Sequence, residues 1–79
     1  MRLDKYLKLT RIIKRRTVAN DACDASRVSV NGRPAKASYD VKIGDIIEIT
    51  FGEKTLKFRV KDVKEHVTKE AAPEMYEAL

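Results

Sequence analysis

RLDKYLK at residues 2–8, RIIKRRT at residues 11–17 and VSVNG at residues 28–32 carry the clearest structural signals of this 79-residue chain. In the first segment, Leu3 and Leu7 are four residues apart and share one face of a helix that we predict over residues 2–9. In the third, two valines alternate with serine and lead into Asn31-Gly32, the strongest short signal for a two-residue hairpin turn. The pattern therefore changes from helical to strand periodicity by residue 28.

A second helix is predicted after the basic connection at residues 10–16. Thr17 is a suitable N-cap, although Arg16 could begin the helix instead. The apolar residues of this helix are small, so it can pack close to a neighbour; they form one stripe of Val18, Ala22 and Ala25, with Ala19 and Cys23 beside it.

Strands follow from residue 28 to residue 60. Pro34 is expected at the edge of a return strand that continues through Ala35 and Ala37. A second, longer hairpin turns at residues 52–54, between the alternating apolar positions Ile47, Ile49, Phe51 and Leu56, Phe58, Val60. We predict an α+β fold with two N-terminal helices packed on a small, twisted, mostly antiparallel sheet.

The last dozen residues are predicted as a short helical tail. Thr68 and Pro73 both suit helix starts, and Met75, Tyr76 and Leu79 could dock one turn onto the body. We therefore divide the chain into a domain at residues 1–67 and a tail at residues 68–79.

The positive charge lies almost entirely at the N-terminus. Residues 1–16 hold seven basic residues and one acid, or +6, whereas residues 17–79 hold ten basic and eleven acidic residues, or −1. This asymmetry favours a polyanionic partner. A lone cysteine cannot form an internal disulfide, and no apolar run approaches the length of a membrane span, so we expect a cytoplasmic protein that contacts no membrane.

Five short motifs resemble the alpha-L RNA-binding domain, which is named after a small-subunit ribosomal protein. They are RLDKYL at 2–7, KRRT-x-A at 14–19, V-x-VNG at 28–32, AK at 35–36 and VK-x-GD at 41–45. Each motif is weak alone, but five in this order and spacing are specific. Along nearly its whole length the chain is also similar to the stand-alone ribosome-associated quality-control protein P family, which is related to the heat-shock protein fifteen family.

The resemblance implies a role on the ribosome. That family binds the rRNA of the large subunit when it carries a stalled peptidyl-tRNA, and it supports alanine tailing of the nascent chain by a partner factor. Two other functions stay open: a constitutive ribosomal component, and an accessory subunit of an RNA-modification enzyme. A DNA-binding helix-turn-helix is more distant, because the second helix offers Asn20, Asp21 and Asp24 rather than cations.

The predicted RNA-binding residues are Arg2, Lys5, Lys8, Arg11, Lys14, Arg15, Arg16, Asn31 and Arg33. Guanidinium groups suit phosphate oxygens, and the three arginines at 2, 15 and 16 lie in the family motifs; the alternative for them is a solvated charge run. Among Lys5, Lys8, Arg11 and Lys14, some are expected to supply only long-range attraction. Asn31 has a purely structural alternative, because its turn requires positive φ. Asp4 is expected to orient a neighbouring cation or to favour the helix start.

No residue pattern predicts catalysis or metal binding. The one histidine, His66, has no Cys or His at ligand spacing, and the chain offers no nucleophile–base pair. We expect Tyr6 and Cys23 in the core. The chain is therefore predicted to be a monomeric binding module without a cofactor.

Overall fold

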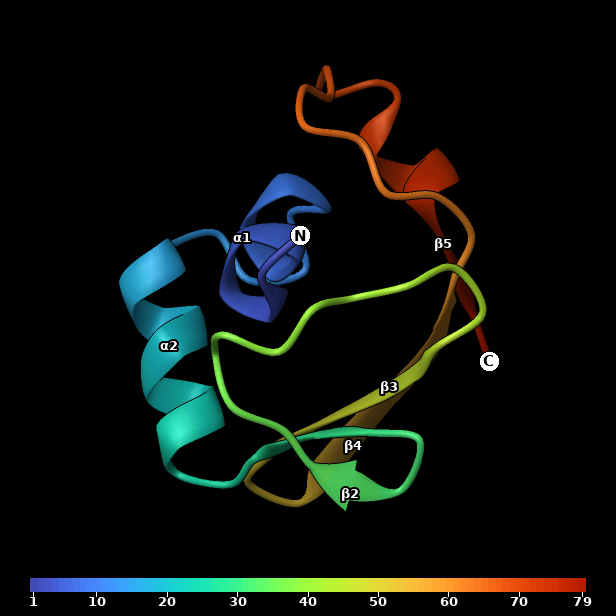
Figure 1. Cartoon of the computed structure of the whole chain (residues 1–79). Helices are drawn as coiled ribbons and strands as arrows, with labels where there is room; N and C mark the ends of the chain where they lie inside the picture. The colour runs from blue at the N-terminus through green and yellow to red at the C-terminus, as the bar shows by residue number, and fades with distance from the viewer.

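The computed structural model describes all 79 residues as two helices and one five-stranded sheet (Figure 1). The helices are α1 (Leu3–Leu9) and α2 (Arg16–Asp24), and the strands are β1 (Val28–Val30), β2 (Arg33–Pro34), β3 (Ile46–Phe51), β4 (Lys54–Val60) and β5 (Tyr76–Ala78). The strand order is β2-β1-β3-β4-β5, and every neighbouring pair is antiparallel. The predicted α+β class is confirmed.

The two helices pack against each other on one side of the sheet (Figure 1). Leu3, Tyr6 and Leu7 of α1 are fully buried, and they share a core with the inward-facing residues Ile47 and Ile49 of β3. The period of two in β3 and the four-residue spacing in α1 thus point their apolar side chains to one interior. Neither helix has the length and apolar character needed to cross a membrane.

α2 begins at Arg16, with Arg15 as its N-cap, so Thr17 lies inside the first turn. Its buried face consists of Ala19, Ala22 and Cys23. The predicted stripe was wrong at Val18, which is 45% exposed, and at Ala25, which lies beyond the helix end. This nine-residue helix packs against α1 along one narrow face, so only three of its side chains are shielded from solvent.

The return strand of the first hairpin is shorter than predicted. β2 ends at Pro34, which has no N–H to donate to a ladder and lies in an edge strand as expected. Residues 35–39 instead turn toward α1, where the carbonyls of Ala37 and Tyr39 accept the N–H groups of Asp4 and Leu3. This segment therefore satisfies the first free N–H groups of α1 instead of extending the sheet.

Only a short part of the predicted helical tail is helical. Residues Ala72–Met75 form one 3-10 turn with Pro73 in its first positions, and Tyr76–Ala78 then pair with β4 as β5. Residues 76–78 are extended because the edge of β4 offers backbone hydrogen-bond partners that a continued helical turn would not supply. Met75 is buried, and the Tyr6 Oη donates a hydrogen bond of 2.8 Å to its carbonyl. The proposed domain boundary at residue 67 stays a prediction.

Candidate nucleic-acid interface

A buried carboxylate lies at the centre of the N-terminal basic region. Asp4 occupies the first turn of α1, and its side chain is only 3% exposed, whereas the side chains of Arg2 and Arg16 beside it are about half exposed. Arg2 directly precedes α1 and Arg16 is the first residue of α2. The packing of α1 against α2 therefore brings together two guanidinium groups that are 14 positions apart in the sequence.

Asp4 bonds to both arginines. Its Oδ1 lies 3.2 Å from the Arg2 Nε, and its Oδ2 lies 3.3 Å from the Arg16 Nε. A second Arg2 nitrogen donates to Oδ2 at 3.3 Å, so Arg2 contacts both carboxylate oxygens. Because each guanidinium has five N–H donors, both keep donors free for a phosphate or a base.

Two further donors complete the shell of Asp4. The backbone N–H of Lys5 donates to Oδ1 at 2.8 Å, and the Asn20 Nδ2 donates to Oδ2 at 3.4 Å. Asn20 is half-buried between the helices. Its position one turn after Arg16 puts it beside Asp4, and this contact cannot be read from the sequence of α2 alone.

The pKa of Asp4 lies below its ordinary value of 3.8. Burial raises the pKa of this carboxyl, but the hydrogen bonds from Arg2, Arg16, Asn20 and the Lys5 N–H together outweigh that effect. The group is thus ionised at neutral pH, and it holds two cations in place with one negative charge.

A second group of cations lies near the other end of α1. Lys8, Arg11 and Lys14 line an open hollow of about 330 Å³, together with the apolar Leu9 and Val67. Arg11 reaches this position through a left-handed backbone, with φ of 62°. The chain turns there because α1 ends at Leu9, and the hydroxyl of the C-cap Thr10 donates to the carbonyls of Tyr6 and Leu7.

The remaining basic candidates differ in their surroundings. Lys5 forms an ion pair with Glu65, so its ammonium is turned toward the segment that follows β4. Arg15 is exposed at the start of α2, where no side chain caps the helix. Arg15 thus stands with Arg16 at the positive end of a helix dipole.

Asn31 and Arg33 lie at the hairpin between β1 and β2. Asn31 and Gly32 both have positive φ, at 53° and 84°, as the predicted turn requires. Asn31 is exposed, but its side chain is engaged within the chain: its Nδ2 donates to Asp45 at 3.1 Å and its Oδ1 accepts the Ile46 N–H at 3.0 Å. Arg33 is exposed and makes no such contact.

Asp45 is a structural residue that the sequence reasoning missed. It is buried, and besides Asn31 it accepts hydrogen bonds from the Tyr39 Oη and the Lys42 N–H. The signal was present in the Gly44-Asp45 turn before β3, because aspartate in a turn commonly accepts nearby backbone N–H groups.

Tyr6 and Cys23 lie in the core as predicted. Burial raises the pKa of the Cys23 thiol to about 11, with smaller contributions from Asp4 and Asp24, so the thiolate is scarce at neutral pH. No cluster of three or more His, Cys, Asp or Glu side chains is placed to hold a metal ion.

The sequence of this chain matches a known domain family and proteins that share one name. The S4 domain model matches residues 1–47, which include α1, α2 and the first hairpin. The chain is 53% identical to the RQC P-site tRNA stabilizing factor of Streptococcus pneumoniae, over all of this chain and 90% of that protein. It is 49% identical to the factor of the same name from Bacillus subtilis, over all of this chain and 92% of that protein.

A solved structure has nearly the same fold. Heat shock protein 15 from Vibrio cholerae superposes with a TM-score of 0.91 at 28% identity, over all of this chain and 81% of that one. The relation to the heat-shock protein fifteen family, which the sequence motifs indicated, is therefore confirmed.

Proposed function

Because this chain belongs to the S4 domain family and, within it, to the RQC P-site tRNA stabilizing factors, we propose that it binds rRNA and P-site tRNA in ribosome-associated quality control. As a member of a family of binding factors it is not an enzyme. The observation that carries the proposal is the pair of half-exposed arginines, Arg2 and Arg16, held by the buried Asp4.

The proposed mechanism rests on phosphate contacts. Arg2 and Arg16 present donors in fixed directions, which suits the planar, bidentate recognition of phosphate oxygens. Lys8, Arg11, Lys14 and Arg15 add positive potential around α1 and α2 and draw RNA toward this face. The sheet presents no row of stacked aromatic side chains, so the RNA is recognised mainly by backbone and shape.

We further propose that the protein holds peptidyl-tRNA on the large subunit while a partner factor adds alanine residues to the stalled chain. A monomer is sufficient for this role, because one chain supplies both helices of the basic region. Docking on the large subunit places the protein in the cytoplasm.

Sedimentation through a sucrose gradient tests the docking. We expect wild-type protein in a minor large-subunit fraction that is enriched in peptidyl-tRNA, and we expect the Arg2→Ala/Arg16→Ala variant at the top. The matched control is Lys54→Ala/Lys69→Ala, which removes the same charge from exposed positions outside the basic region and should sediment like wild type. Equal binding of wild type to empty and to peptidyl-tRNA-loaded large subunits would contradict the proposal. Stoichiometric presence on all ribosomes would instead indicate a constitutive component.

The alanine-tailing step has its own test. Cells that lack the protein should carry shorter or fewer alanine tails on a stalled reporter chain, as measured by mass spectrometry. Wild-type protein should restore the tails, and the double arginine variant should not. Normal tails in its absence would limit the function to RNA binding.

A further inference from the structure

We propose that the hollow beside the first hairpin binds one unstacked nucleobase of an RNA strand, between phosphates held by Arg33 and Lys36. This inference rests on the proposed RNA-binding function and adds a second contact outside the Asp4 site. The hollow has a volume of about 660 Å³ and lies between the β1–β2 hairpin and residues 35–39.

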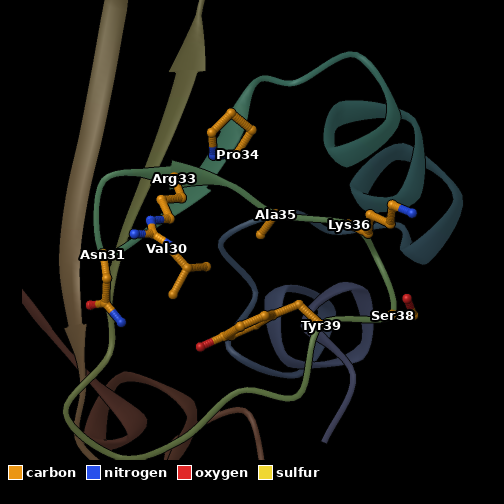
Figure 2. Close-up of a pocket in the computed structure, with 8 residues that line it drawn as sticks. All are labelled: Val30, Asn31, Arg33, Pro34, Ala35, Lys36, Ser38 and Tyr39. Atoms are coloured by element: carbon orange, nitrogen blue, oxygen red, sulfur yellow. The ribbon is translucent and has the colours of Figure 1, made fainter.

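The walls of the hollow are apolar and aromatic. Figure 2 shows the Tyr39 ring lying across the hollow below Val30 and Ala35, with Pro34 on the far side of the hairpin. A flat base can stack on an aromatic face while its edge stays near a polar group, and the Ser38 hydroxyl on the rim supplies one.

The hollow is preformed because the buried carboxylate of Asp45 accepts hydrogen bonds from two residues that line it, Tyr39 and Asn31. Asp45 accepts the Tyr39 Oη at 2.9 Å and the Asn31 Nδ2 at 3.1 Å. The hydroxyl of Tyr39 points toward the side where Asn31 lies (Figure 2), so the ring is anchored at its far end. A base would therefore enter without reordering these side chains, which lowers the entropic cost of binding.

The charges at the rim fit a nucleotide. The residues that line the hollow include two cations, Arg33 and Lys36, and no acid. The side chains of Arg33 and Lys36 lie on opposite sides of the hollow in Figure 2, and Lys36 points toward α2. This spacing suits a base held in the middle and the phosphates of its strand on either side.

A second hollow lies beside the first and borders the Asp4 site. This second hollow of about 490 Å³ shares the wall residues Pro34, Ala35, Lys36 and Ser38 and reaches Arg2 at its other side. An RNA strand that contacts Arg2 can therefore pass Lys36 and place its next unpaired base against Tyr39. This path favours RNA over a peptide as the occupant.

The test compares two RNA hairpins that differ at one position. One carries a single extrahelical adenosine, and the other has an abasic site there. Fluorescence anisotropy at low salt should show wild type binding the first hairpin at least about fivefold more tightly, as expected for one base on an aromatic ring. Tyr39→Leu should abolish this preference but keep affinity for the abasic hairpin.

Two further variants separate the hollow from general effects. Ala35→Leu fills the hollow from its wall, leaves the Tyr39–Asp45 bond in place, and should also abolish the preference. Phe51→Leu removes an aromatic ring that is 39% exposed on β3, away from the hollow, and should keep the preference. Circular dichroism checks that each variant is folded.

Amide chemical shifts of the wild-type protein give an independent reading if Tyr39→Leu does not fold. The two hairpins should produce different shifts at Ala35, Ser38 and Tyr39. Equal affinity of wild type for both hairpins, or differences confined to other residues, would overturn the base site and leave RNA binding intact. Failure of wild type to bind either hairpin would count against the proposed function itself.

Discussion

Among single residues, Asp4 has the largest influence on the proposed interface. An acid in a basic patch weakens the long-range attraction for RNA, yet this one is buried and bonded to both Arg2 and Arg16. The net effect of Asp4 on RNA binding depends on which matters more: the fixed direction of the two guanidinium groups or the total positive charge of the patch. A neutral side chain of the same shape can separate the two.

Asp4→Asn should weaken docking on the large subunit several-fold, although it raises the net charge of the chain from +5. The amide cannot hold two guanidinium groups, so Arg2 and Arg16 lose their fixed directions. Gradient sedimentation or filter binding measures the effect, and Asp21→Asn, which removes an exposed acid of α2, is the control. Tighter specific docking by Asp4→Asn would show that only charge matters.

Asp4 should also make the stability of the fold depend on pH. Its pKa is lowered in the folded state, so its ionised form stabilises the fold above the ordinary carboxyl pKa of 3.8. That contribution should be lost as the pH falls through the lower, folded pKa. Urea denaturation at several pH values should show a difference between wild type and Asp4→Asn that is constant near neutrality and shrinks in acid. A constant difference down to the lowest pH would contradict this assignment.

Among the elements, the C-terminal turn and β5 are tied to α1. The Tyr6 Oη donates to the Met75 carbonyl, which also accepts the N–H groups of Lys61 and Asp62. The ring of Tyr76 packs edge-on against Phe58 of β4, with centroids 5.5 Å apart. The Met75 carbonyl, directly before β5, thus links α1 to the residues that follow β4.

Tyr6→Phe should lower the free energy of unfolding by about 1–2 kcal/mol, because it removes a buried hydrogen bond and leaves the ring in place. Chemical denaturation measures the loss, and hydrogen exchange should be faster at the β4–β5 amides than elsewhere in the sheet. Tyr76→Phe is the matched control, because the Tyr76 hydroxyl makes no hydrogen bond within the chain. Equal losses in the two variants would contradict a specific role of the Tyr6 hydroxyl.

For the whole molecule, the uneven charge is the dominant property. The cations of residues 1–16 lie on and between two helices that pack on one side of the sheet (Figure 1), so one face carries most of the positive potential. Association with RNA should therefore depend strongly on salt, and the dependence should come from this face.

The slope of log K against log salt should fall by about 1.4–1.8 in magnitude in the Arg2→Ala/Arg16→Ala variant, since each phosphate contact contributes about 0.7–0.9. Lys54→Ala/Lys69→Ala removes equal charge at exposed positions and should leave the slope nearly unchanged. Binding isotherms between low and physiological salt measure both. An equal fall in the two variants would indicate diffuse attraction without defined phosphate contacts.

Local patterns in the sequence were sufficient for most elements. The spacing of Leu3 and Leu7, the Asn31-Gly32 turn and the alternation around Ile47 and Phe58 predicted α1 and both hairpins. The five motifs predicted the family before any comparison. These features can be predicted from the sequence because each depends on residues that are near neighbours in the chain.

The order of residues along the chain thus specifies the two helices, the hairpins and the concentration of positive charge in the first sixteen residues. The packing of the helices and the sheet sets three further features: Asp4 joins Arg2 to Arg16, the tail adds β5 to the sheet, and Asp45 holds Tyr39 beside an open hollow. Each of these contacts joins segments that are separated in the chain. Their formation depends on how α1, α2 and the sheet pack together, and no local periodicity encodes that packing.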